Sequence, residues 1–476
     1  MNAPWTAASP RIALLAAVIF AALPARAADY PVASAADIAR VTEKLRPGDA
    51  LVMADGIWKD QAIVFRGAGT AEKSITLRAR TPGKAVLTGA STVTIDGDYL
   101  VARGLYVKDG HGEGKDAVAL RGRHCRLTES AVVDSRYKFD VHLYGENNRL
   151  DHCYLAGKTS DSPTVQVEVG ERPNNHRIDH NHFGPRPPLG RNGGETLRVG
   201  YSGQSMRDSR TLVEQNLFDR CDGELEIISS KSCKNVYRFN TFLESAGMLT
   251  LRHGNRCRVE GNVFLGRHKK GSGGVRIIGD DHVIVGNYID GVDKGAFWIT
   301  AGIPNSPLAG YFPARNALVA FNTVVDSKGP YLDLNAGFGT SNRSLRPEKI
   351  TIANNLFLLF LLPEGGTLLK GEEGSGFRWV GNLADGPAGA TLPEHAGIRI
   401  ADPKLTRGED GLWHPAPDSP AIGAAEGGFP LVTSRTSGIT GIRADVGSRQ
   451  SHGRLLNWRS RPLSVADVGP PWMKLR

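Results

Sequence analysis

Cysteine is scarce in this chain, with only five among 476 residues, at positions 125, 153, 221, 233 and 257. None of them has the paired spacing of a zinc site, which excludes a cysteine-bound structural zinc. We interpret all five as apolar side chains within a core. A bridge between Cys233 and Cys257 stays open if the two residues lie on adjacent turns of the fold.

Long apolar runs are also missing beyond the first 23 residues. Arg11 precedes the apolar residues 12–23, and Ala25-Arg26-Ala27 supplies the small residues of a cleavage site. Twelve apolar residues are too few to span a bilayer, which requires about 20. We therefore expect residues 1–27 to be a cleaved signal peptide, with export to the periplasm or the medium and no membrane insertion; an uncleaved anchor is the alternative.

Patterns with a helical period are rare, whereas 57 glycines and many short β-branched runs indicate strands and tight turns. One helix is expected over residues 35–45, beginning near Ser34 and ending before Pro47-Gly48. We expect residues 28–476 to form a single domain. From residue 408 the chain becomes rich in Pro, Gly and Arg, and we interpret residues 408–476 as a distal cap and a wrapping tail.

An asparagine followed by two residues, the second apolar, recurs along the middle of the chain. Its central intervals are 24, 22 and 25 residues, and the outer ones reach 35. This period is typical of a solenoid. We therefore predict an all-β, single-stranded, right-handed parallel β-helix with an N-terminal capping helix, in which the asparagines form an internal ladder. The asparagines are Asn181, Asn216, Asn240, Asn262, Asn287, Asn322, Asn355 and, with a weaker match, Asn382.

The chain has an excess of cations, with a formal charge of +9 and an isoelectric point near 9.3. Such an excess can attract nucleic acid, anionic lipid or an acidic polymer. An exported protein meets polysaccharide more often than nucleic acid. We therefore expect an anionic polysaccharide as the partner, no nucleic acid, and a monomer.

An acidic pair stands in Asp222-Gly-Glu-Leu-Glu-Ile-Ile-Ser-Ser-Lys-Ser232. Glu224 and Glu226 are two residues apart, so on a strand both would point to the same face. Two such carboxylates repel each other unless a cation lies between them, and Ca²⁺ accepts irregular oxygen ligands. Asn192 and Glu195, in Asn192-Gly-Gly-Glu-Thr196, could complete the site. Alone, the pair would indicate a solvated strand face.

Three cations follow at similar distances from the asparagine ladder. Lys231, Arg252 and Arg276 precede their next ladder asparagine by nine, ten and eleven residues. Equivalent positions of successive coils stack about 4.8 Å apart, so we expect a column of cations on one outer face. Without the acidic pair, three solubilising surface residues would be the better interpretation.

The carboxylates could bind a metal cation, and the lysine and arginines could bind an acidic sugar. This combination favours β-elimination in a uronic acid polymer. A lysine with a lowered pKa could remove the C5 proton, while calcium and arginine neutralise the carboxylate of the sugar. Glycoside hydrolysis requires two carboxylates about 5–9 Å apart, one of them protonated. We expect the neighbouring cations to keep both glutamates ionised, which favours the lyase.

These segments, together with Leu251-Arg-His-Gly-Asn255, resemble the polysaccharide lyases of family 6, which include alginate lyases and chondroitinase B. The resemblance extends over most of residues 28–476, through motifs such as Arg46-Pro-Gly-Asp49 and Asp445-Val-Gly447. It implies a calcium-dependent parallel β-helix. It further implies that Asn192, Glu224 and Glu226 hold the calcium, with Glu195 as a further ligand, that Lys231 is the Brønsted base and Arg252 the acid, and that His253 and Arg276 contact the substrate.

The sequence therefore predicts a calcium-dependent lyase that cleaves alginate in mannuronate-containing stretches and leaves 4,5-unsaturated ends. A lyase acting on chondroitin B (dermatan sulfate) is the nearest alternative. Ser230 is compatible with that alternative, because many alginate-acting members have asparagine at this position. A non-catalytic glycan-binding β-helix is the alternative from another class.

Overall fold

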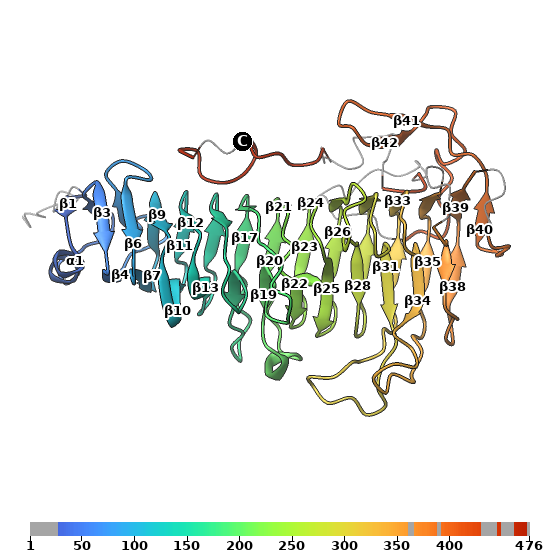
Figure 1. Cartoon of the computed structure of the whole chain (residues 1–476), viewed down its shortest axis with the longest axis horizontal. Helices are drawn as coiled ribbons and strands as arrows, with labels where there is room; N and C mark the ends of the chain where they lie inside the picture. The colour runs from blue at the N-terminus through green and yellow to red at the C-terminus, as the bar shows by residue number, and fades with distance from the viewer. Residues whose placement is uncertain (1–26, 360–365, 388–391, 430–444, 449–460, 474–476) are drawn as a thin grey trace, which may run out of the picture.

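Three long parallel β-sheets wind into one solenoid in the computed structural model (Figure 1). The structure describes residues 27–359, 366–387, 392–429, 445–448 and 461–473. Apart from the two ends of the solenoid, each coil contributes one strand to each sheet, and all pairs within the three sheets are parallel. This is the predicted right-handed parallel β-helix. Right-handed crossovers are the rule for connections between parallel strands.

The strands of the three sheets are short, most of them with three or four residues. Sheet A contains β1 (Asp29–Val32), β2 (Ala50–Met53), β5 (Ile75–Ala79), β8 (Leu100–Arg103), β11 (Arg126–Thr128), β14 (Arg149–Asp151), β17 (Arg177–Asp179), β20 (Leu212–Glu214), β23 (Val236–Arg238), β26 (Arg258–Glu260), β29 (Val283–Val285), β32 (Leu318–Ala320), β35 (Thr351–Ala353) and β38 (Arg378–Val380). Sheet B contains β3 (Gly56–Lys59), β6 (Ala85–Thr88), β9 (Leu105–Lys108), β12 (Ala131–Val133), β15 (Tyr154–Ala156), β18 (His182–Phe183), β21 (Leu217–Asp219), β24 (Thr241–Leu243), β27 (Val263–Leu265), β30 (Tyr288–Asp290), β33 (Thr323–Val325), β36 (Leu356–Leu358), β39 (Asn382–Asp385) and β40 (Ile398–Ile400). Sheet C contains β4 (Ala62–Ala68), β7 (Thr92–Asp98), β10 (His111–Leu120), β13 (Arg136–Leu143), β16 (Val165–Val167), β19 (Leu197–Val199), β22 (Glu226–Lys231), β25 (Met248–His253), β28 (Val275–Ile277), β31 (Phe297–Thr300), β34 (Leu332–Ala336) and β37 (Leu369–Lys370).

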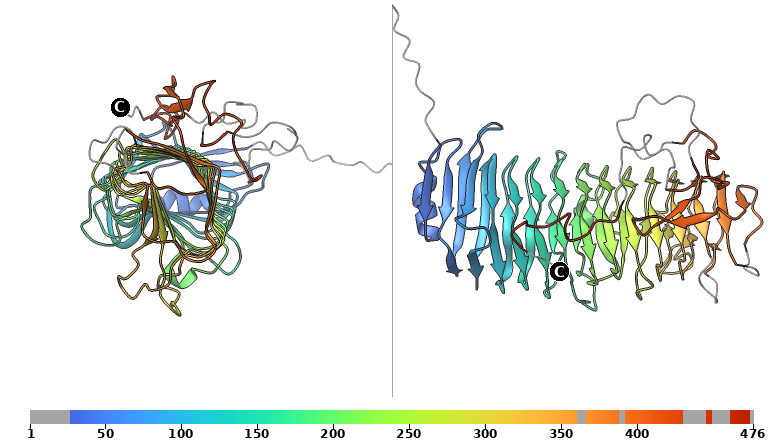
Figure 2. Two further views of the ribbon diagram at one scale, coloured as in Figure 1. Left: turned by 90° about the vertical axis from the view of Figure 1, so that its right-hand side faces the viewer. Right: turned by 90° about the horizontal axis from the view of Figure 1, so that it is seen from above.

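The predicted capping helix is present at the N-terminal end of the solenoid, where Figure 2 shows it across the end of the coil. Helix α1 (Ala35–Thr42) begins after Ser34, whose hydroxyl accepts a hydrogen bond from the Asp37 amide at 3.1 Å. It ends three residues before the predicted end at residue 45. The buried Ile38 anchors its apolar face to the core.

The asparagine ladder is confirmed as an internal structure. From Asn181 to Asn382, the Nδ2 atom of each asparagine donates to the Oδ1 atom of the next at 2.9–3.0 Å. The same Oδ1 atoms accept backbone amides, so these buried polar groups are satisfied. Beside the ladder, the rings of Phe183, Phe218, Phe242 and Phe264 stack at 4.4–4.7 Å.

All five cysteines are buried and free. The proposed bridge between Cys233 and Cys257 is therefore wrong, and the interpretation as core residues is correct. The Cys257 thiol donates to the Ser232 carbonyl instead, at 3.4 Å. Within the described ranges, no helix has the length and apolarity needed to cross a membrane.

The described C-terminal segments lie outside the coil. Strands β41 (Leu405–Arg407) and β42 (Trp413–Pro415) form an antiparallel hairpin. Residues 461–473 then return along sheet B, where the Leu463 amide donates to Thr241 Oγ1 at 2.8 Å and the Trp472 indole donates to the Glu129 carbonyl at 2.5 Å. The division into a signal peptide, one domain and a wrapping tail stays a prediction, and residues 1–26 lie outside the described residues.

Arginine–carboxylate pairs link successive coils on the outer face of sheet A. Arg126 pairs with Asp151 at 2.6 Å, and Arg149 pairs with Asp179 at 2.6 Å. Burial alone would raise the pKa of Asp151, but hydrogen bonds from Arg126 and His152 lower it well below its ordinary value. Carboxylates of this kind stabilise the fold while they are ionised.

We therefore expect the melting temperature to fall as the pH drops below about 4, the ordinary pKa of aspartate. The depressed pKa in the folded state means that the stabilisation is complete above that value and is lost as these carboxylates take up protons. Calorimetry between pH 7 and pH 3 would measure this change. Asp151→Asn should lower the melting temperature at pH 7 and flatten the acid dependence; an unchanged acid slope in this variant would contradict the assignment.

Candidate active site

The predicted site residues lie on sheet C and on the turns that lead into it. Lys231 ends β22, Arg252 and His253 end β25, and Arg276 lies in the middle of β28. Glu195 and Glu224 precede β19 and β22, in turns that come from sheet B. In Figure 1 the loops that follow β19, β31 and β34 extend from the opposite edge of sheet C. The residues thus lie on one face of the coil, between two sets of loops.

Three carboxylates converge at this face. Glu195, Glu224 and Glu226 each offer an oxygen, and these oxygens lie within 4.8 Å of one another. Glu224 and Glu226 were expected to point to the same face of one strand. This reason was wrong, because strand β22 begins at Glu226 and Glu224 lies in the turn before it. The chain is irregular at this point, with a register shift between Glu226 and Ile228, and the turn directs Glu224 toward Glu226.

The acidic cluster has the features of a cation site. Both carboxylate oxygens of Glu195 and Oε1 of Glu224 are buried without a hydrogen-bond partner. Burial raises the pKa of Glu224 to about 7, and the charges of Glu195 and Glu226 add to the effect. Buried carboxylates are rarely left unpaired, because their desolvation is costly. Three closely spaced hard oxygens match the ligand type of Ca²⁺.

Asn192 lies at the edge of this cluster. Its side chain is exposed and lines a cavity that Glu224 also lines. The amide of the next residue, Gly193, donates to Glu224 Oε2 at 3.2 Å. Asn192 is therefore on the same turn as Glu195 and beside Glu224, where its amide oxygen can join the carboxylates around a cation.

The three predicted cations contact the acidic cluster. Lys231 Nζ lies 3.8 Å from Glu195 Oε1. Arg252 Nε and Arg276 Nη1 lie 3.8 and 3.6 Å from the same Glu226 oxygen. Burial lowers the pKa of Lys231; Glu226 and Glu195 oppose this effect, and the charges of Arg198 and Arg252 add to it.

The three cations gather on one face, as expected, but they do not occupy equivalent register positions. Lys231 pairs with His253 across the sheet, and Arg276 pairs with Thr250. A register shift between Ser230 and Lys231 causes part of the offset. The cations converge because their long side chains reach two neighbouring carboxylates, Glu195 and Glu226, although their backbone positions are not aligned.

His253 and Ser230 are both buried. The His253 side chain is 1% exposed, and its Nε2 lies 2.7 Å from Arg252 Nη1 and 3.2 Å from the Gly310 carbonyl. Burial, together with Arg252 and Lys231, lowers the pKa of His253 to about 3, so its ring is neutral at physiological pH. Ser230 is fully buried, and its hydroxyl accepts from Asn235 Nδ2 at 3.2 Å. Ser230 therefore cannot contact a substrate directly.

Sequence reasoning missed an aromatic residue at the centre of this face. The ring of Tyr311 lies beneath three guanidinium groups, with the Arg252, Arg343 and Arg276 carbons at 4.1, 4.7 and 5.5 Å from its centroid. Burial would raise the pKa of Tyr311, but these arginines lower it overall. The 35-residue interval between Asn287 and Asn322 signalled a long insertion here, but nothing in the repeat showed which residue would reach the site.

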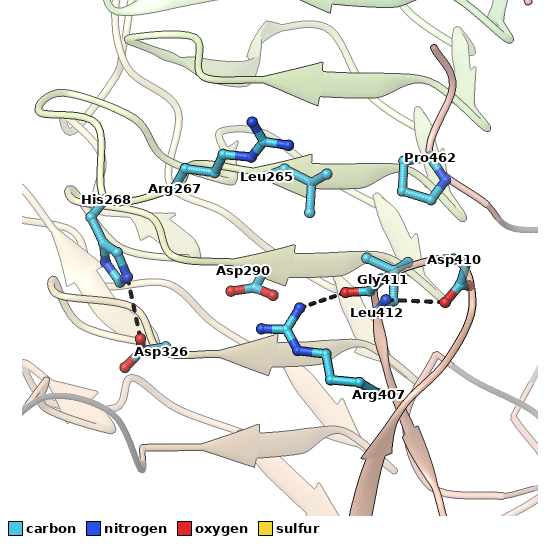
Figure 3. A pocket seen from close by; sticks show the side chains of 10 residues that line it. All are labelled: Leu265, Arg267, His268, Asp290, Asp326, Arg407, Asp410, Gly411, Leu412 and Pro462. Atoms are coloured by element: carbon cyan, nitrogen blue, oxygen red, sulfur yellow. Dashed lines mark hydrogen bonds and ion pairs between the residues drawn. The ribbon is translucent and has the colours of Figure 1, made fainter.

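A second cavity lies between sheet B and the C-terminal hairpin (Figure 3). His268 Nε2 lies 3.4 Å from Asp326 Oδ2, and Arg407 donates to the Gly411 carbonyl at 2.5 Å. Cationic and anionic side chains alternate around it, so it lacks the excess of cations that a polyanion requires. Its lining residues are Leu265, Arg267, His268, Asp290, Asp326, Arg407, Asp410, Gly411, Leu412 and Pro462.

Comparison with known proteins assigns the chain to a family. The sequence model of chondroitinase B matches residues 32–420. A mannuronic acid specific polysaccharide family 6 lyase from the human gut microbiota is 32% identical, with a TM-score of 0.70, and the match covers 79% of this chain and 91% of that one. The chain belongs to polysaccharide lyase family 6.

Other solved structures of family 6 agree with this assignment. The alginate lyase AlyGC is 34% identical over 94% of this chain, with a TM-score of 0.79, and this chain spans 59% of its length. The family 6 lyase Pedsa3628 from Pseudopedobacter saltans is 25% identical, with a TM-score of 0.71, and the match covers 94% of this chain and all of that one. No curated protein matches the sequence.

Proposed function

We propose that this chain is a calcium-dependent lyase that cleaves alginate by β-elimination, in mannuronate-containing stretches. The observation that carries the proposal is the position of Lys231 and Arg252 beside the cluster of Glu195, Glu224 and Glu226. The solved relatives described as an alginate lyase and as a mannuronic acid specific lyase support the choice of polymer.

The acidic cluster would hold the calcium ion, with Asn192 at its edge. When bound, the ion would supply positive charge that neutralises the carboxylate of the sugar and so acidifies its C5 proton. Arg276 is 7% exposed and also faces Tyr311. Its guanidinium would bind the sugar carboxylate on the side opposite the calcium ion. The buried His253 would fix the Arg252 side chain and the Gly310 backbone from below.

Lys231 is proposed as the base. Its lowered pKa raises the fraction of neutral amine that can remove the C5 proton. The electron pair of that C–H bond forms the C4–C5 double bond, and the bond from C4 to the glycosidic oxygen breaks. Arg252, whose pKa is lowered by burial, donates a proton to the leaving oxygen. The products are one reducing end and one 4,5-unsaturated uronate end.

Hydrolysis is the rival chemistry. Burial and the other two glutamates raise the pKa of Glu224 to about 7, while the charge of Lys231 opposes this rise. Hydrolysis would give saturated ends, whereas elimination gives an unsaturated end that absorbs in the ultraviolet. The two reactions are therefore distinguished by their products.

The test is to incubate the purified protein with poly-mannuronate, poly-guluronate and dermatan sulfate. We expect unsaturated ends, followed by absorbance and by mass, to form fastest from poly-mannuronate. Faster cleavage of dermatan sulfate would support the alternative suggested by the chondroitinase B match. Binding without cleavage of any polymer would support the glycan-binding alternative.

We further propose that the protein is exported after removal of residues 1–27. The support is the apolar run 12–23 and the Ala25-Arg26-Ala27 motif. Sequencing of the mature N-terminus would test the export proposal.

A further inference from the structure

Arg186 is a buried arginine behind the acidic cluster that the chemistry above does not use. It lies between β18 and β19, pairs with Cys221 of the next coil through a β-bridge, and is 3% exposed. Its side chain therefore lies within the turns that carry Glu195 and Glu224.

The guanidinium of Arg186 bridges two successive turns. Nη2 donates to the carbonyls of Ser162 at 2.9 Å, Ser160 at 3.3 Å and Gly193 at 3.4 Å. Nη1 donates to the Glu195 carbonyl and, at 3.2 Å, to Thr164 Oγ1. All of these acceptors are neutral groups, and two of them belong to the turn that carries Glu195.

A buried guanidinium normally pairs with a carboxylate. Among the described residues, none places a carboxylate oxygen within 4.0 Å of Arg186 in an ion pair, although the charges of Asp140, Glu195 and Glu224 oppose the lowering of its pKa by burial. Its planar fork of donors is used to fix backbone, which a point-charge ammonium cannot reproduce.

The other turn of the cluster packs directly on Arg186. A Cβ atom at Gly223 would lie 3.0 Å from both Cδ and Nε of Arg186, and 2.1 Å from the Gly194 carbonyl oxygen. Gly223 therefore allows the backbone before Glu224 to pass close to both Arg186 and the Gly194 turn. Arg186 thus contacts the backbone on both sides of the acidic cluster.

We propose that Arg186 is a positioning residue that sets the separation of the Glu195 and Glu224 carboxylates, and thereby the affinity for Ca²⁺. The inference rests on the proposed function, since it assumes that these carboxylates hold calcium. Arg186 does not contact the substrate, so its loss weakens calcium binding and leaves the catalytic groups in place.

The experiment measures calcium binding by calorimetry on chelator-stripped protein, for wild type, Arg186→Lys and Thr164→Val. Lysine keeps the charge but cannot bond to both turns, so we expect affinity to fall by at least ~10-fold, the lower range for loss of an outer-shell partner. Thr164→Val removes one acceptor only, and we expect a measurable but smaller loss of affinity than in Arg186→Lys. Saturating calcium should restore the turnover of both variants to near the wild-type value.

Arg126→Lys is the matched control, because Arg126 lies on sheet A and pairs with Asp151. It should lower the melting temperature without changing calcium affinity. Wild-type affinity in both Arg186→Lys and Thr164→Val would overturn the positioning role, as would turnover in both that excess calcium fails to restore. If Arg186→Lys does not fold, the Thr164→Val result alone decides. A wild-type protein that binds no calcium yet forms unsaturated product would refute the calcium assignment and this inference, but not the lyase.

Discussion

Lys231→Ala is expected to reduce the formation of unsaturated product by ~10²–10⁴-fold, the range for loss of a general base. Lys231 ends β22 with its amine 3.8 Å from Glu195, and burial lowers its pKa. Few other groups on this face can accept a proton, since Arg252 and Arg276 are cations. The effect should fall mainly on kcat, because the arginines that bind the sugar carboxylate remain. Absorbance of the unsaturated ends is the measurement.

The control for this variant is Lys234→Ala. Lys234 belongs to the same coil and pairs with Asp208 at 2.6 Å, away from the acidic cluster. It should keep wild-type turnover. Circular dichroism and the melting temperature should show that both variants fold. Turnover of Lys231→Ala within a few-fold of wild type would remove Lys231 from the role of base.

Removal of calcium is expected to abolish turnover, and its return should restore it. Without calcium, the oxygens of Glu195, Glu224 and Glu226 lie within 4.8 Å of one another, and those of Glu195 and one of Glu224 are buried without a hydrogen bond, so the site loses the charge that holds the three carboxylates together. The measurement is product formation after treatment with a chelator, followed by titration with Ca²⁺. Full activity in excess chelator would contradict the calcium assignment.

Glu224→Gln tests the same site without a chelator. It keeps the size of the side chain and removes its charge, so we expect calcium affinity to fall by more than the ~10–100-fold typical of an outer-shell change. Glu244→Gln is the control, since Glu244 pairs with Arg267 at 2.8 Å on another face. Equal calcium affinity in the two variants would exclude Glu224 as a ligand.

The fold could be predicted from the sequence because its repeat follows from a strict physical requirement. A buried asparagine must satisfy its amide in every coil, so Asn216, Asn240 and Asn262 recur at the length of one turn. Helix α1 was predicted for a similar reason, since Ser34 supplies a cap that the first turn requires. The C-terminal end of helix α1 was less predictable, because its last turn has no capping residue comparable to Ser34.

The site could be predicted by residue type but not by geometry. The carboxylates and cations stood out in the sequence, yet Glu224 lies before its strand, and a register shift places Lys231 opposite His253 instead of Arg252. The buried position of Ser230 depends on the same local register. Tyr311 reaches the site from a long loop. The position of a loop residue cannot be predicted from the repeat, because the loop is not part of the repeating unit.

The return of residues 461–473 along sheet B has a consequence for how the molecule comes apart. A solenoid in which each coil touches only its neighbours can fray from either end. Here residues 461–473 are bonded to both Thr241 and Glu129, which lie more than a hundred residues apart, so coils that do not touch one another share one strap. Unfolding of the coils between these two anchors is thereby coupled, and loss of these contacts would let those coils separate independently.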